Sequence, residues 1–180
     1  AMCRALKPTS RRILIDMGAS LDFHSGNQPI MFLLNQFEKF GFHFDHIYAF
    51  EITGAEPQHV YDTIPQKYMS SYHWINVGVN DQDGHKLNPL HSILKQFDPD
   101  DLIVVKLDID TPQIELPLAM QLLKDPVYHE LVDQFYFEHH VALKELLPYW
   151  GGAAKKQTVK ESIDLFLALR EKGIPAHFWP

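Results

Sequence analysis

Residues 102–112 read LIVVKLDIDTP, and this stretch joins a strand to a helix through two acidic residues. The run that ends at Leu107 is rich in apolar and β-branched residues, which favours a buried strand. Thr111-Pro112 is typical of a helix start, because threonine caps an N-terminus and proline is tolerated in the first turn. Asp108 and Asp110 are therefore predicted to lie at the rim of a sheet, where α/β proteins build their binding sites.

The same succession of strand and helix recurs on both sides of this stretch. Runs of apolar and β-prone residues predict strands at residues 13–15, 46–50, 74–79, 102–107, 134–137 and 174–179. Strands that alternate with helices indicate an α/β fold, with a doubly wound, mostly parallel sheet and helices on both faces.

Apolar residues at helical spacing, together with capping residues, predict the helices between these strands. They are expected at residues 30–40, 57–64, 88–97, 111–122 and 158–172. Pro65 should interrupt the second of these helices, so two short helical pieces are expected there. The apolar residues assigned to the core are Phe32, Phe37 and Phe40 in the first helix, and Ile163, Phe166 and Leu167 in the last.

Composition limits the classes to which the chain can belong. Its 180 residues are 46% hydrophobic and 22% charged, with a net charge of −7. This predicts one globular domain at residues 11–180, with residues 1–10 as an N-terminal extension or an expression-vector remnant, since Ala1 precedes Met2. The acidic charge argues against a nucleic-acid partner, and no apolar run reaches the ~20 residues of a membrane span. The single cysteine, Cys3, excludes an intrachain disulfide, so we expect a protein of the cytoplasm or another soluble compartment.

Acidic residues follow most of the predicted strands. Asp16 follows the first strand, Glu51 the second, and Glu138 the fifth, while Asp108 and Asp110 follow the fourth. The carboxyl ends of parallel strands meet at one edge of a sheet, and ligands of doubly wound sheets bind there. These carboxylates are therefore predicted to surround a common site.

Three of these segments resemble motifs of the class I S-adenosylmethionine-dependent methyltransferases, and within that class the FkbM-type family. IDMGA at residues 15–19 is similar to the family's first motif, IYAFE at residues 47–51 to its second, and VKLDID at residues 105–110 to its fourth-strand motif. The resemblance implies a Rossmann-like methyltransferase fold with S-adenosylmethionine as cofactor. It also implies methylation of an oxygen atom on a small molecule or sugar.

The resemblance implies a cofactor-binding role for several residues. Gly18 and Ala19 would let the backbone approach the cofactor, and Asp16 would lie near its amino-acid end. Glu51 would accept hydrogen bonds from the ribose hydroxyls, because two adjacent donors match the two oxygens of a carboxylate. The residues that would contact the adenine follow the third strand and are Asn80 and Asp81.

Removal of the acceptor's proton is assigned to Asp108, Glu138 or His139. Asp108 would face the methyl-transfer region, and a neutral imidazole has a pKa suited to a general base. In a simpler interpretation of His139-His140, one histidine faces the core with a satisfied hydrogen bond and the other is exposed.

Asp108 and Asp110 also support a metal-based hypothesis. Alternate residues converge where a strand end bends, and divalent cations prefer clustered carboxylate oxygens. On this interpretation the chain is a nucleotide-sugar glycosyltransferase whose Asp-x-Asp pair holds a divalent cation. In the simpler interpretation, Asp110 belongs to the helix start beside Thr111.

A third hypothesis is a non-catalytic, methyltransferase-like binding domain. FkbM-type sequences usually read Asp-x-Glu-Gly after the fourth strand, whereas residues 108–111 read DIDT, and the first turn has Gly18 as its only early glycine.

Aromatic residues and glycines at residues 146–154 predict a loop that covers the site. A nicotinamide-type dinucleotide site is set aside, because there is no G-x-G-x-x-G motif.

Overall fold

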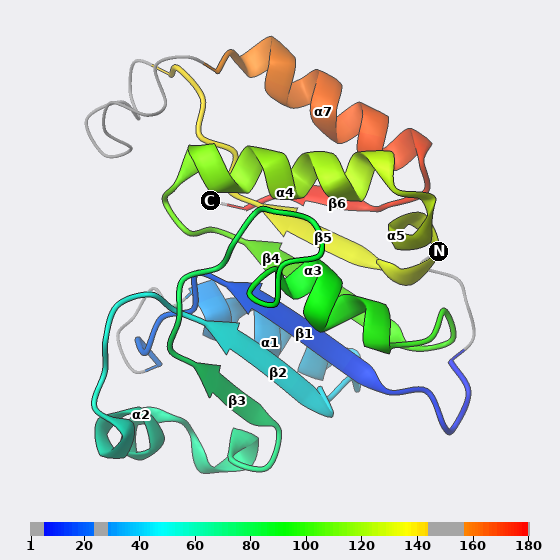
Figure 1. Cartoon of the computed structure of the whole chain (residues 1–180). Coiled ribbons are helices and arrows are strands. Elements are labelled where there is room, and N and C mark those ends of the chain that lie inside the picture. The colour runs from blue at the N-terminus through cyan, green and yellow to red at the C-terminus, as the bar shows by residue number, and fades with distance from the viewer. Residues whose placement is uncertain (1–5, 24–28, 144–156, 180) are drawn as a thin grey trace.

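The computed structural model describes residues 6–23, 29–143 and 157–179. In this part of the chain six strands form one sheet, and every neighbouring pair is parallel (Figure 1). The strands are β1 (Arg12–Met17), β2 (His46–Phe50), β3 (Tyr72–Ile75), β4 (Leu102–Leu107), β5 (Gln134–Phe137) and β6 (Ala176–Phe178). Their order across the sheet is β3-β2-β1-β4-β5-β6. The prediction of a parallel, Rossmann-like α/β sheet is confirmed, whereas the loop predicted at residues 146–154 lies outside the described residues.

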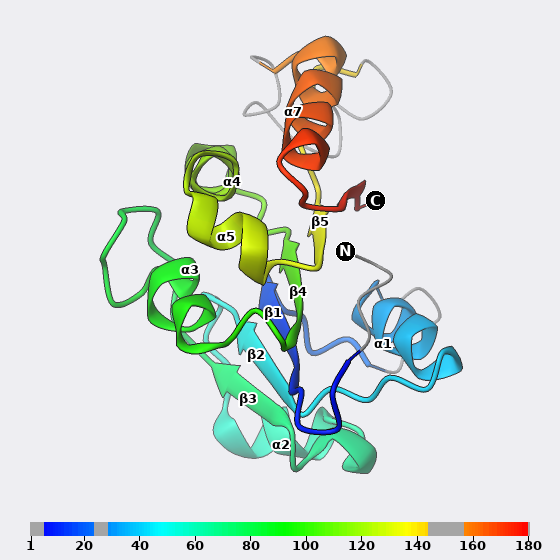
Figure 2. The same cartoon turned by 90° about the vertical axis from the view of Figure 1, so that its right-hand side faces the viewer.

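Helices cover both faces of the sheet, as Figure 2 shows. One face carries α1 (Pro29–Lys39), and the other carries α3 (Pro89–Ser92), α4 (Pro112–Lys124) and α5 (Pro126–Leu131). One apolar core includes buried residues of α1 and α2 (Pro57–Thr63), and a second includes those of α3, α4, α5 and α7 (Val159–Glu171). Burial on both faces explains why the central strands are almost entirely apolar. None of the helices in the described ranges is long and apolar enough to cross a bilayer.

The order of the strands reverses between β1 and β4, the two central strands. Their register pairs Arg12 with Leu102 at one end and Met17 with Leu107 at the other. From β1 the chain moves outward to β2 and β3, and from β4 it moves outward to β5 and β6 in the opposite direction. Such a reversal leaves a crevice at the carboxyl ends of the two strands, where α/β proteins bind ligands.

Some element boundaries differ from the predictions. β3 begins at Tyr72 rather than at residue 74, and it ends at Ile75 rather than at residue 79. The single helix predicted at residues 88–97 is divided into α3 and a 3₁₀ turn, η2 (Leu94–Gln96). The division expected at Pro65 is confirmed, because α2 ends at Thr63 and a second short piece, η1 (Gln66–Tyr68), follows it.

Two of the phenylalanines assigned to the core are exposed, so that part of the prediction is wrong. Phe32 is 61% exposed and Phe40 is 78% exposed, whereas Phe37 is partly buried against the core. The residues of α1 that are buried are Ile30, Leu33 and Leu34. Residues of a helix are separated by about 100° around its axis, so Phe32 points away from this stripe.

α7 begins as predicted but buries a different face. Thr158 and Glu161 form the predicted capping box, with each backbone N–H donating to the other's side chain. Phe166 is buried as predicted, but Ile163 is 46% exposed and Leu167 is 51% exposed. The cap therefore identifies the start of this helix better than the apolar pattern identifies its buried face.

Candidate functional site

A cavity of about 490 Å³ lies at the carboxyl ends of β1, β2 and β4, where the strand order reverses. Its lining comes from the segments that follow these strands and β3: residues 18–20, 50–53, 77–79 and 108–111, together with Ile114 of α4. Of the sequence-predicted residues, it brings together Gly18, Ala19, Glu51, Asp108 and Asp110. This is the position at which doubly wound sheets bind their ligands.

Gly18 allows the first turn to pass very close to β4. Its φ is +87°, a conformation that favours glycine. A Cβ at this position would lie 1.5 Å from the backbone oxygen of Asp108. The N–H groups of Gly18 and Ala19 both donate to the carbonyl oxygen of Phe50, at 3.0 and 2.9 Å. The turn is thus held between β2 and β4, and its glycine is required by packing whatever the cavity binds.

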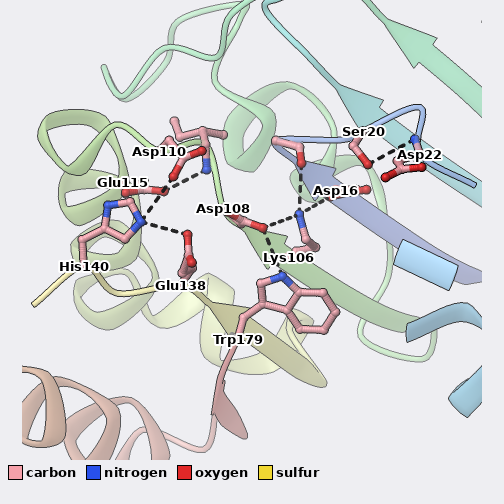
Figure 3. A network of polar contacts seen from close by, with 12 residues as sticks. Asp16, Ser20, Asp22, Lys106, Asp108, Asp110, Glu115, Glu138, His140 and Trp179 are labelled. Atoms are coloured by element: carbon pink, nitrogen blue, oxygen red, sulfur yellow. Dashed lines mark hydrogen bonds and ion pairs between the residues drawn. The ribbon is translucent and has the colours of Figure 1, made fainter. Parts of the chain in front are cut away.

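A buried lysine, Lys106 of β4, organises the polar groups beneath this turn (Figure 3). Its Nζ lies 3.0 Å from Oδ1 of Asp16 and 3.2 Å from Oδ2 of Asp108, and it also donates to the backbone oxygen of Gly18 at 3.1 Å. The indole N–H of Trp179 donates to the same Asp108 oxygen at 3.1 Å. Burial alone would lower the pKa of Lys106, but the charges of Asp16 and Asp108 outweigh burial and raise it. Lys106 is therefore a fixed positive charge under the cavity.

Asp16 does not line the cavity in the way the resemblance implies. Its side chain is fully buried, and it accepts a hydrogen bond from Lys106. Its position makes it a structural partner of Lys106.

Glu51 follows β2 directly and lines the cavity beside the Gly18 turn, which is hydrogen-bonded to the preceding residue, Phe50. One of its carboxylate oxygens accepts the backbone N–H of Thr53 at 2.6 Å. The side chain of Asn76 donates to the backbone oxygen of Glu51 at 2.7 Å, which ties this loop to the end of β3. These contacts orient Glu51 at the cavity wall.

Asn80 and Asp81 lie outside the cavity lining. The Asn80 side chain accepts the N–H of Gln82, and the backbone oxygen of Asp81 accepts from the side chain of Gln121. The first contact shapes the loop itself, and the second ties the loop to α4. Residues 77–79 line the cavity instead, because β3 ends before them.

The structure separates Asp108 from Asp110, which were predicted to hold one cation together. Asp108 faces Lys106 and Trp179, whereas Asp110 faces His140, with its Oδ1 3.5 Å from the His140 Nε2 (Figure 3). Asp110 has a φ of +53°, a left-handed conformation that aspartate tolerates better than most residues. This turn of the backbone interrupts the alternation that would place both carboxylates on one side.

A second polar group lies beside the cavity, at the ends of β4 and β5. His140 Nε2 lies 2.8 Å from Oε2 of Glu138, and ligand atoms of Asp110, Glu138 and His140 lie within 4.8 Å of one another. Glu115 of α4 is buried next to them, with one oxygen accepting the backbone N–H of Ile109 at 2.8 Å. The sequence predictions included Asp110 and Glu138 but missed His140 and Glu115.

His139, one of the predicted catalytic residues, lies in the core below α7. Its ring stacks on Phe137 with a centroid distance of 5.0 Å, and its Nδ1 lies 2.9 Å from the hydroxyl of Ser162. Burial lowers the pKa of His139 to about 4, and the positive charge of His140 contributes in the same direction. The simpler interpretation is right for His139, which faces the core with a hydrogen bond, but wrong for His140, which is also buried.

The burial of His139 predicts a loss of stability in acid. In the unfolded chain this histidine takes up a proton near its ordinary pKa of 6.5, whereas in the folded chain it resists protonation until about pH 4. The contribution of His139 to the free energy of unfolding is thus fully present above pH 6.5 and is lost as the pH falls. Between pH 7.5 and pH 5 the loss is about 2 kcal/mol. Urea unfolding of the wild type and of His139→Gln at both pH values should show this difference in pH dependence. An equal loss in both proteins would contradict a neutral, buried His139.

The ionisable groups that line the cavity have one sign of charge. Among the described residues they are Glu51, Asp108 and Asp110, and no lysine or arginine belongs to the lining. Such a wall attracts cations and repels phosphates.

Comparisons of the chain with protein-family models, with curated proteins and with solved structures found no match.

Proposed function

We propose that the chain is an S-adenosylmethionine-dependent methyltransferase that acts on an oxygen atom of a small molecule or sugar. The observation that carries the proposal is the position of Glu51, at the end of β2 and on the wall of the cavity beside the Gly18 turn. A carboxylate there can accept hydrogen bonds from both hydroxyls of a ribose. The cavity of about 490 Å³ falls within the range of sites for small molecules and cofactors.

The charge of the cavity also favours this cofactor over nucleotides that carry a diphosphate. S-adenosylmethionine has a positively charged sulfonium, which suits a wall that contains Glu51, Asp108 and Asp110. A dinucleotide or a nucleotide sugar would bring its diphosphate to the same three carboxylates, of which only Asp108 is paired with a lysine, the buried Lys106. The glycosyltransferase hypothesis also relies on Asp108 and Asp110 sharing one cation, whereas each of them faces different partners.

Methyl transfer is an in-line displacement, so the protein's tasks are to position the acceptor and to remove its proton. Asp108 lines the cavity and is oriented by Lys106 and Trp179, which suits it to positioning the acceptor. Glu138 lies beside His140 at the end of the neighbouring strand, and this pair is our candidate for receiving the proton. His139 is left out, because its ring packs in the core against Phe137.

Isothermal titration calorimetry tests the proposal. Wild-type protein should bind S-adenosylmethionine and S-adenosylhomocysteine, and bind NAD⁺ and UDP-glucose much more weakly. Glu51→Ala removes hydrogen bonds to a charged acceptor, each worth roughly 1.5–3 kcal/mol, so its affinity should fall by at least tenfold. Glu130→Gln, a change at an exposed residue of α5, is the control and should bind like the wild type.

Two outcomes would reject the cofactor assignment. One is a wild type that is folded but does not bind S-adenosylmethionine. The other is an affinity that is the same in Glu51→Ala and in the wild type. If the cofactor binds and no acceptor in a broad panel is methylated, a non-catalytic binding domain becomes the better description.

A further inference from the structure

The second polar group, Asp110, Glu138 and His140, has the composition and spacing of a metal site. Its three ligand atoms, two carboxylate oxygens and an imidazole nitrogen, lie within 4.8 Å of one another. The His140 Nε2 is 2.8 Å from Glu138 Oε2 and 3.5 Å from Asp110 Oδ1, so the three atoms face a common point (Figure 3). We propose that these residues bind one divalent transition-metal ion, with Glu115 as a fourth ligand.

Glu115 supplies an independent observation for this site. It is 1% exposed, and its Oε1 accepts the backbone N–H of Ile109 at 2.8 Å. Its second oxygen, Oε2, is buried and has no hydrogen-bond partner among the described residues. Figure 3 shows the carboxylate beside the imidazole of His140. A buried carboxylate oxygen without a partner is costly, and a bound cation would satisfy it.

The elements that carry these residues hold them in place without any ion. Asp110 follows β4, Glu138 and His140 follow β5, and these two strands are hydrogen-bonded neighbours. Glu115 lies in the first turn of α4, which starts directly after the Asp110 turn. Glu115 lies within a helix, and the other three residues lie within three positions of the ends of paired strands, so ion binding requires little rearrangement.

The donor set indicates which ions fit. Imidazole nitrogen suits Zn²⁺ and other late transition metals, whereas carboxylate oxygens also suit Mn²⁺. Mg²⁺ and Ca²⁺ prefer sites made of oxygen alone. We therefore expect Zn²⁺ and Mn²⁺ to bind, with an affinity that decreases from Zn²⁺ to Mn²⁺ and is lowest for Mg²⁺.

The site borders the cavity, because Asp110 belongs to both. The side chain of Asp110 is 82% exposed, whereas that of His140 is 2% exposed, so an ion would be reached from the solvent side through Asp110. With the ion bound, Glu138 and His140 would be its ligands instead of the proton acceptor, and the ion would hold a hydroxyl of the methyl acceptor and favour the loss of its proton to water. This last role rests on the proposed function, but the binding of the ion does not.

Metal titration without S-adenosylmethionine tests the site separately from the proposed function. Protein stripped with EDTA and dialysed is titrated with ZnCl₂, MnCl₂ and MgCl₂ by calorimetry, and Mn²⁺ binding is followed by electron paramagnetic resonance. One saturable Zn²⁺ or Mn²⁺ site is expected in the wild type. Asp110→Asn and Glu138→Gln should each weaken it by at least tenfold, and Glu115→Gln should weaken it as well.

Matched controls exclude binding to other histidines and carboxylates. His43 and Glu130 are exposed and lie outside the group, so His43→Gln and Glu130→Gln should leave the site unchanged. Asp110→Asn alters a mostly exposed side chain and should fold normally, which circular dichroism can verify. The ion should also raise the melting temperature of the wild type but not that of Asp110→Asn. The absence of a saturable site in the wild type, or equal affinity in Asp110→Asn and the wild type, would overturn the proposal.

Discussion

Gly18→Ala is expected to destabilise the chain by about 4 kcal/mol or more, because it combines backbone strain with a steric clash. Gly18 has a φ of +87°, and a Cβ at this position would lie 1.5 Å from the backbone oxygen of Asp108. That oxygen follows the central strand β4, so it cannot move without disturbing the sheet. Urea unfolding followed by circular dichroism measures the loss, and the variant should also lose affinity for S-adenosylmethionine.

Gly41 provides a matched control for this substitution. It also has a positive φ, +78°, but nothing lies within 4 Å of the position of its Cβ. Gly41→Ala should therefore show the backbone strain alone, about 1–2 kcal/mol. Similar losses in Gly18→Ala and Gly41→Ala would show that the first turn does not approach β4 as closely as described.

Lys106→Met is expected to cost about 3 kcal/mol or more, because it leaves a buried charge without a partner. The Lys106 ammonium contacts Asp16, which is fully buried, and Asp108, which lines the cavity. Methionine has a similar shape but no charge, so the loss would report the electrostatic contribution rather than a cavity. The same urea measurement gives its size.

A double-mutant cycle separates this effect from changes in packing. In Lys106→Met combined with Asp16→Asn, the buried charge is removed together with its partner, so part of the stability should return. Lys160→Met alters an exposed lysine that pairs with Asp164 within α7, and it should change stability little. If Lys106→Met is as stable as the wild type, the buried ion pair does not hold the first turn and β4 together.

The sequence predicts the sheet well because its signals are local. Strand-forming runs before Asp16, Glu51 and Asp108 alternate with capped helices, and the rule for parallel crossovers then leads to a doubly wound sheet. The errors concern side-chain direction within helices: Phe32 and Leu167 are apolar and close to the expected period, yet both face solvent. Which face is buried depends on the neighbouring elements, which local spacing does not specify.

The site was predicted in part, and the residues that were missed have physical explanations. The alternation of side chains after β5 could have identified His140, since His139 shares a side with the buried Phe137 and His140 shares one with Glu138. The separation of Asp108 from Asp110 could not be predicted, because it depends on a positive φ at a residue that is not glycine. Glu115 could not be identified from the sequence either, because a glutamate in the first turn of a helix is ordinarily exposed and stabilised by the helix dipole.

A crystal structure of the protein with S-adenosylhomocysteine tests the central claim most directly, because it shows what occupies the crevice between β1 and β4. We predict density for the ligand in the cavity, with the ribose hydroxyls hydrogen-bonded to Glu51 and the homocysteine sulfur directed toward Asp108. Crystals soaked at saturating concentration in which the ligand binds away from this cavity, or in which Glu51 makes no contact with it, would contradict the account.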